Sequence, residues 1–101
     1  MLHNIIRTDN DLRLAVSVKK GNHQSVGLLY DKYASALSGI ISRITNNEKL
    51  AEEILNITFV KLWNQIGTFN SSNTSLFTWL INITRQTAFY DIRTEKKPTI
   101  R

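Results

Sequence analysis

Apolar residues at helical spacing dominate this sequence of 101 residues. The single proline is Pro98, close to the C-terminus, and no stretch shows the alternation of a half-buried strand. The most regular apolar face lies in residues 24–44 and is formed by Val26, Leu29, Tyr30, Tyr33, Leu37, Ile40, Ile41 and Ile44. We therefore expect an all-α protein, a compact bundle of about four helices.

Helix-ending residues divide the chain into its helical segments. Gly21 and Gly67 each follow an apolar pattern, and Asn46 and Asn47 separate two others. Ser75 or Thr74 is suited to cap the last helix. The predicted helices cover about residues 9–20, 24–44, 48–66 and 76–96.

The length of the chain predicts a single domain. We find no internal repeat and no low-complexity tract that would mark a linker within it. The expected organisation is a flexible N-terminus, one helical domain, and a C-terminal tail or start of a linker, covering residues 1–8, 9–97 and 98–101 in that order.

The charge of the chain narrows the class of partner. The net charge of +5 favours polyanions, either nucleic acid or an anionic surface. The sequence contains no cysteine and only two histidines, His3 and His23, so we expect no metal and no cofactor. Apolar runs do not reach the roughly 18–20 residues that cross a bilayer. We expect a cytoplasmic protein that does not bind membranes.

Catalytic patterns are not found. None of the eight acidic residues stands at motif spacing from a histidine, and no glycine-rich phosphate loop is present. Glu52 and Glu53 are neighbours in a predicted helix, so their side chains point in different directions. We expect a binding protein and not an enzyme.

The loop at residues 68–75 and the helix after it suit unpaired nucleic acid. The loop is uncharged and rich in Asn, Ser and Thr, and few acids follow it. Amides and hydroxyls bind base edges, aromatic rings stack on bases, and cations bind phosphates. An ordinary polar turn and a solvated charged helix face are the simpler alternatives. The candidate DNA-binding residues are Asn70, Ser71, Ser72, Asn73, Thr74, Ser75, Phe77, Thr78, Asn82, Arg85, Gln86, Phe89, Arg93, Lys96 and Lys97.

The predicted helix at residues 48–66 is apolar on two sides. Its core side carries Ala51, Leu55, Phe59, Leu62 and Ile66, whereas Ile57 and Val60 fall nearly opposite. A helix that is apolar on two sides has two partners. The second partner is either another protein or the first helix of this domain. The candidate partner-binding residues are Lys49, Glu52, Glu53, Asn56, Ile57, Val60 and Asn64.

Three segments together resemble a known family. They are LLYDKYASALSGIISRI at 28–44, LAEEILNITFVKLW at 50–63 and FNSSNTSLFTWLINITR at 69–85. In order and spacing they are similar to region two of bacterial sigma factors of the extracytoplasmic-function (ECF) group. The resemblance implies a transcription-initiation domain that is monomeric alone, docks on the β′ clamp helices of RNA polymerase core, and captures the non-template strand of the promoter minus-ten element with one base flipped into a loop pocket.

The chain departs from the pattern of that family at several motif positions. The polymerase-contacting motif carries Glu53, Asn56 and Ile57 where the family has Asp, Gln and Glu. The loop carries Thr74 in place of Gly, and Gln86 and Tyr90 replace Asn and Asp. These changes leave open an alternative function, a helical protein-interaction module that keeps the fold without promoter binding. The resemblance also leaves open whether an anti-sigma factor binds the chain.

Overall fold

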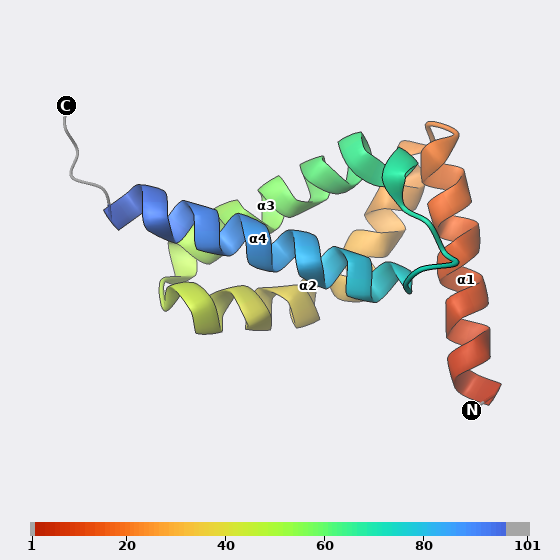
Figure 1. The fold of residues 1–101 in the computed structure, drawn as a ribbon, viewed down its shortest axis with the longest axis horizontal. Helices are drawn as coiled ribbons and strands as arrows, with labels where there is room; N and C mark the ends of the chain where they lie inside the picture. The colour runs from red at the N-terminus through yellow and green to blue at the C-terminus, as the bar shows by residue number, and fades with distance from the viewer. Residues whose placement is uncertain (1, 97–101) are drawn as a thin grey trace.

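Within residues 2–96, four α-helices and one short 3-10 helix make up the fold (Figure 1). The structure, a computed structural model, describes residues 2–96 and the side chains of residues 10–90. The elements are α1 (Leu2–Lys19), α2 (His23–Thr45), α3 (Glu48–Gln65), η1 (Ile66–Thr68) and α4 (Leu76–Lys96). No strand occurs in residues 2–96. The prediction of an all-α bundle of four helices is confirmed.

Three polar side chains fix the starts of α2, α3 and α4. Each accepts a hydrogen bond from a backbone N–H in the first turn, with donor–acceptor distances of 2.9, 3.0 and 3.1 Å. Such caps satisfy amide groups that have no partner inside the helix. The capping residues are Asn22, Asn47 and Ser75. The helix starts predicted from the sequence agree with the structure at these three places to within one residue.

Helix α1 begins earlier than predicted. It starts at Leu2 and not near Asp9, so it includes most of the segment expected to be a flexible N-terminus. The physical reason is that residues 2–19 contain neither glycine nor proline, and that extending a formed helix adds a hydrogen bond for each residue fixed. The domain boundaries themselves stay a prediction.

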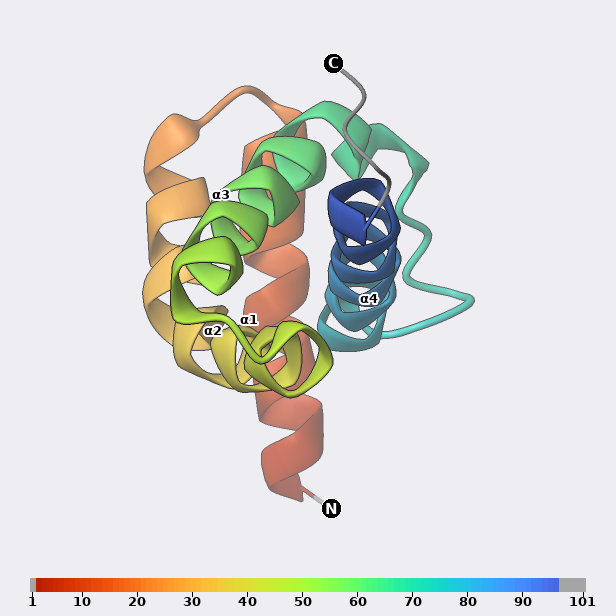
Figure 2. The same cartoon turned by 90° about the vertical axis from the view of Figure 1, so that its left-hand side faces the viewer.

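The core lies between α2, α3 and α4, with α1 packed across one end. Figure 1 shows α1 crossing near the start of α4, and Figure 2 shows α4 end-on beside the other helices. Helix α1 packs on α2, α4 and η1. The largest fully buried side chains are Leu29, Leu37, Ile41, Ile54, Leu62, Leu76, Leu80, Thr58, Thr84 and Thr87. Each of these threonines donates to the carbonyl four residues earlier, so its buried hydroxyl is satisfied.

Buried residues hold both ends of the loop between η1 and α4. Phe69 is buried and contacts the ring of Trp79 at a centroid distance of 5.4 Å. The Lys19 Nζ, at the end of α1, donates to the Phe69 carbonyl oxygen at 3.2 Å. At the other end Leu76 is buried in the core. The polar residues between these two anchors are therefore presented on a short, fixed segment.

Candidate partner and nucleic-acid interfaces

The second apolar side of α3 is exposed. Ile57 is 38% exposed and Val60 is 58% exposed. Since α1 packs on α2, α4 and η1, the alternative in which α1 covers this side is wrong. All the candidate partner-binding residues are exposed, and we call them the α3 face: Lys49, Glu52, Glu53, Asn56, Ile57, Val60 and Asn64. Their role in binding polymerase stays a prediction.

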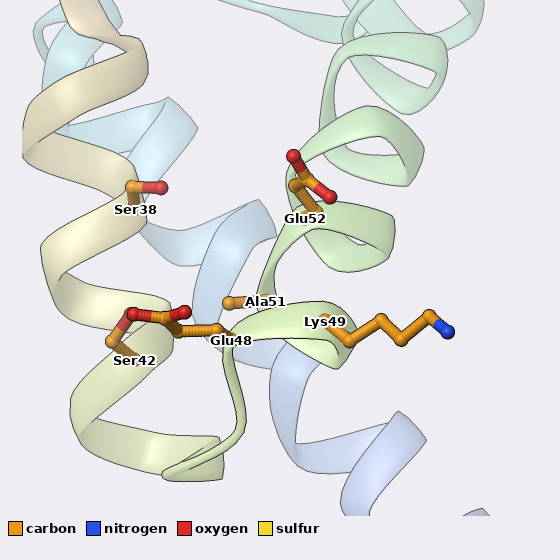
Figure 3. A pocket seen from close by; sticks show the side chains of 6 residues that line it. All are labelled: Ser38, Ser42, Glu48, Lys49, Ala51 and Glu52. Atoms are coloured by element: carbon orange, nitrogen blue, oxygen red, sulfur yellow. The ribbon is translucent and has the colours of Figure 1, made fainter.

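A polar hollow of about 480 Å³ adjoins the α3 face. It lies between the last turns of α2 and the first turns of α3 and is lined by Ser38, Ser42, Glu48, Lys49, Ala51 and Glu52 (Figure 3). Two of these residues, Lys49 and Glu52, also belong to the α3 face. No sequence pattern indicated Ser38, Ser42 and Glu48, because only the packing of α2 beside α3 brings them together.

The loop at residues 70–75 is held by its own hydrogen bonds. The Asn73 backbone N–H donates to the Asn70 carbonyl at 3.0 Å, and the Asn70 side-chain oxygen accepts from the Ser72 N–H at 2.9 Å. Ser75 caps α4 and donates to the Thr78 hydroxyl at 3.0 Å. The hydrogen bonds within the loop are therefore those of an ordinary polar turn, which was the simpler alternative for this segment. Thr74 is half-buried, and the other loop residues named as candidates are exposed.

A pocket of about 290 Å³ lies between this loop and α1. This volume is close to the lower end of the range for pockets that hold small ligands. We call it the loop pocket, and its lining residues are Asp11, Leu12, Ser71, Ser72, Asn73, Thr74, Ser75 and Leu76. The sequence predicted the loop side of the pocket. It did not predict the α1 side, because Asp11 and Leu12 lie far from the loop in the sequence. Nothing in their local pattern distinguishes them from other residues of the first helix.

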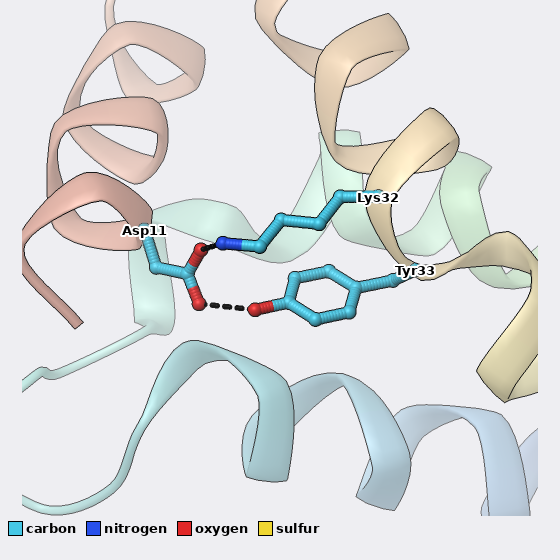
Figure 4. A network of polar contacts seen from close by, with 3 residues as sticks. All are labelled: Asp11, Lys32 and Tyr33. Atoms are coloured by element: carbon cyan, nitrogen blue, oxygen red, sulfur yellow. Dashed lines mark hydrogen bonds and ion pairs between the residues drawn. The ribbon is translucent and has the colours of Figure 1, made fainter. Parts of the chain in front are cut away.

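Asp11 joins α1 to α2 at the edge of the loop pocket. Its side chain accepts from the Lys32 Nζ at 2.7 Å through one oxygen and from the Tyr33 hydroxyl through the other (Figure 4). Asp11 is only 6% exposed. A buried carboxylate needs such partners because it has left water. The wall of the pocket formed by α1 is therefore fixed to the rest of the bundle.

The two aromatic candidates differ in accessibility. Phe89 is 53% exposed. Phe77 is half-buried and stacks on Tyr33 with ring centroids 4.7 Å apart and an interplanar angle of 19°. Tyr33 of α2 covers one face of the Phe77 ring, so that face is not free to stack on a base. The expectation from the sequence is wrong for that face. Tyr90, which the sequence analysis did not include among the candidates, is also exposed.

A stripe of exposed side chains continues from the loop along α4. Its members Thr78, Asn82, Arg85 and Phe89 follow the three-and-four spacing of one helix side, and all are exposed. Gln86 lies beside them and is also exposed. We call these five residues the α4 stripe. The side chains of Arg93 and Lys96 lie outside the described ones, and Lys97 lies outside the described residues, so all three stay predictions.

Two features are absent from the part of the chain that the structure describes. Among those residues, no three His, Cys, Asp or Glu side chains are grouped so that they could hold a metal ion. The described helices include none with the length and apolar character needed to cross a bilayer.

Comparison with known proteins identifies the family. The sequence model for Sigma-70 region 2 matches residues 29–97, more than half of the chain. The RNA polymerase sigma-H factor of Pseudomonas aeruginosa is 26% identical over 84 residues, which cover 83% of this chain and 43% of that protein. The ECF RNA polymerase sigma factor SigK of Mycobacterium sp. strain KMS is 23% identical over 91 residues, covering 90% and 47%.

The chain spans less than half the length of these two curated relatives. Both relatives are named as RNA polymerase sigma factors, and one is named as a member of the ECF group. The resemblance predicted from the three sequence segments is thereby confirmed. The chain belongs to the Sigma-70 region 2 family.

Proposed function

We propose that this domain docks on core RNA polymerase through the α3 face and captures unpaired promoter DNA with the loop pocket and the α4 stripe. The observation that supports the proposal best is the loop pocket itself, a hollow of about 290 Å³ with hydroxyl and amide side chains in its lining, beside a helix that carries Arg85. The hydrogen bond between Ser75 and Thr78 joins the pocket rim to the start of the α4 stripe. A strand that enters the pocket with one base can therefore follow α4 with its backbone.

In this proposal the domain acts by capture and does no chemistry. A base of the minus-ten element leaves the stack of the non-template strand, at a cost of a few kcal/mol in unpairing and unstacking. The hydroxyls and the amide around the pocket bind its edge, and contacts within the pocket offset that cost. Arg85 binds a phosphate, and Phe89 offers a ring on which a neighbouring base stacks. The family assignment agrees with a protein that is not an enzyme.

The α3 face has the composition of a protein interface. Ile57 and Val60 form an exposed apolar centre, and charged and amide side chains surround it. Interfaces commonly combine an apolar centre with a polar rim. In the proposed complex the clamp helices of the polymerase β′ subunit cover this centre. Docking holds the loop pocket beside melted DNA, so the bound strand loses less freedom on capture.

A binding assay with short oligonucleotides tests the proposal. The chain is titrated, with and without core polymerase, against single-stranded DNA, duplex DNA and a bubble with an unpaired minus-ten region. We expect binding to unpaired DNA to be weak for the chain alone, stronger with core polymerase, and weaker as salt rises. Failure to prefer any unpaired DNA in the presence of polymerase would refute DNA capture.

The loop's own hydrogen bonds also favour a second candidate function. The side-chain oxygen of Asn70 and the hydroxyl of Ser75 already bind within the loop, and Ile57 replaces a carboxylate of the docking motif. A module that binds a helical protein through the α3 face, with no DNA contact, fits these observations. The same assay separates the two functions, because this module binds no oligonucleotide at any salt concentration.

A further inference from the structure

We propose that Lys19, the last residue of α1, is a positioning residue for the loop pocket, and that it holds the start of the loop at residues 70–75 in the conformation that captures DNA. This inference rests on the proposed function, because it concerns the same pocket. Lys19 neither lines the pocket nor belongs to residues 29–97 that match the family. It therefore acts through the residue that it holds in place and does not touch the bound strand.

Lys19 makes two contacts with the residue that precedes the loop. Its Nζ donates to the Phe69 carbonyl oxygen at 3.2 Å and lies 5.9 Å from the centroid of the Phe69 ring. A cation over an aromatic face is attracted by the π electrons of the ring, and a charged donor makes a stronger hydrogen bond than a neutral one. One ammonium group thus holds both the backbone and the side chain of Phe69.

Lys19 stands on a fixed part of α1. Its neighbour Val18 is buried in the core, so the last turn of the helix is packed on the bundle. Gly21, which has a positive φ, ends the helix, and its N–H donates to the Val18 carbonyl at 2.9 Å. The ammonium group therefore reaches Phe69 from an anchored backbone.

Phe69 connects this anchorage to α4 and to the loop. Its side chain is buried and contacts the ring of Trp79 in α4. Its backbone leads directly into Asn70, whose carbonyl and side-chain oxygens accept from the N–H groups of Asn73 and Ser72. Since Ser72 and Asn73 line the loop pocket, a shift of the Phe69 carbonyl would displace part of the pocket lining.

Loss of the ammonium group should leave the start of the loop less restricted. Water must then satisfy the Phe69 carbonyl, and the loop samples conformations in which the pocket is not formed. A strand that binds has to order the loop, which weakens binding. We expect the affinity for unpaired DNA to fall about three- to tenfold, the usual effect of one hydrogen bond.

Three variants isolate the ammonium group of Lys19. Lys19→Met keeps most of the side-chain length and removes the charge and the donor. Lys20→Met is the matched control, since Lys20 is the exposed neighbour and the net charge changes by the same amount. Lys19→Arg keeps a cationic donor and should restore the contact. A purely structural role would lower thermal stability but would leave DNA binding unchanged at a temperature at which every variant is folded.

Binding of unpaired DNA, with core polymerase present and at several salt concentrations, is the first readout. We expect Lys19→Met to bind about three- to tenfold more weakly with an unchanged salt slope, because no phosphate contact is lost. Lys20→Met and Lys19→Arg should stay within about twofold of wild type. Equal weakening by both methionine variants would indicate a general charge effect, and a lower salt slope with Lys19→Met alone would indicate a phosphate contact. Either result overturns the positioning role.

Hydrogen exchange of the chain alone is a second readout that needs no DNA. In Lys19→Met the backbone amides of Phe69, Ser72 and Asn73 should exchange about three- to tenfold faster, while amides in the middle of α2 exchange as in wild type. Unchanged exchange at these three amides overturns the inference, even where DNA binds normally. Absence of binding to unpaired DNA by wild type refutes the proposed function instead, and the exchange result then decides the role of Lys19 by itself.

Discussion

Tyr33 and Phe77 stack with their ring centroids 4.7 Å apart, while the Tyr33 hydroxyl donates to Asp11. One side chain of α2 thus contacts both α1 and the first turns of α4. These are the elements on either side of the loop pocket. The contacts of Tyr33 make the shape of that pocket depend on the packing of three helices.

The stack should contribute measurably to stability. We expect Phe77→Leu to lower the free energy of unfolding by about 1 kcal/mol, because the aromatic contact with Tyr33 is lost while most of the apolar volume remains. Urea denaturation measures the change. Phe89→Leu is the control, since Phe89 is 53% exposed, and its effect should stay within about 0.5 kcal/mol. Equal effects of the two changes would contradict a stabilising stack.

The cap of α4 provides a second stability test. Ser75 accepts from the Thr78 N–H at 3.1 Å, so Ser75→Ala should lower the free energy of unfolding by about 1 kcal/mol. Ser71→Ala, in the same loop, is the matched control because Ser71 is exposed and lies outside the cap. We expect the control to change stability by less than about 0.5 kcal/mol. Thermal unfolding followed by circular dichroism distinguishes the two variants.

Two glycines should respond to alanine with opposite signs. Gly39 lies inside α2, and a Cβ there meets no atom within 4 Å. Gly39→Ala should raise the free energy of unfolding by about 0.5–1 kcal/mol through helix propensity and a less flexible unfolded chain. Gly21 has a φ of +92°, so Gly21→Ala should lower it by about 1–2 kcal/mol. Chemical denaturation of both variants tests this, and a shared sign would show that the backbone assignments are wrong.

Glutamate substitutions test the α3 face. We expect Ile57→Glu and Val60→Glu to reduce retention of the chain on core polymerase at least about tenfold, because a charge would be buried at the apolar centre of the contact. Leu28→Glu is the control, since Leu28 on α2 is 56% exposed and outside this face. A pull-down with purified polymerase measures retention. Loss with Leu28→Glu as well, or with none of the three, would remove the α3 face as the docking surface.

Loop and stripe variants should affect DNA binding differently. Asn73→Ala should reduce the preference for matched over scrambled single strands, because Asn73 lines the loop pocket. Arg85→Ala should weaken all sequences alike and lower the slope of log affinity against log salt by about 1. Fluorescence anisotropy with polymerase present measures both. If Asn73→Ala weakens matched and scrambled strands equally, the loop has no role in selecting the sequence.

Local sequence signals predicted most of the architecture. The starts of α2, α3 and α4 followed from capping residues and apolar spacing, which act within one turn of the chain. Spacing also placed Ile57 and Val60 opposite the apolar side that contains Leu55 and Phe59, but it left open whether the first helix covers them; the structure shows them exposed. The start of α1 was missed, since residues 2–8 carry no clear stop signal and no clear start signal.

The parts of the candidate site that were missed depend on contacts between distant segments. No local pattern indicates that Tyr33 covers one face of Phe77, or that Asp11 lines a pocket with the loop. From its place in the predicted helix at residues 9–20, Asp11 looks like an ordinary first-turn acid, which the helix dipole favours. Packing of α1 against α2 and α4 determines its actual surroundings.

The participation of α1 in the loop pocket links occupancy of the pocket to the stability of the whole domain. A peptide that covers only residues 69–93 contains nearly every candidate base contact, yet it lacks Asp11 and Leu12 and so lacks one wall. The complete cavity exists only in the folded chain. A strand that binds there binds only the folded chain, so by mass action it lowers the unfolded fraction and raises the melting temperature. Promoter DNA would thereby stabilise the fold of the domain that binds it.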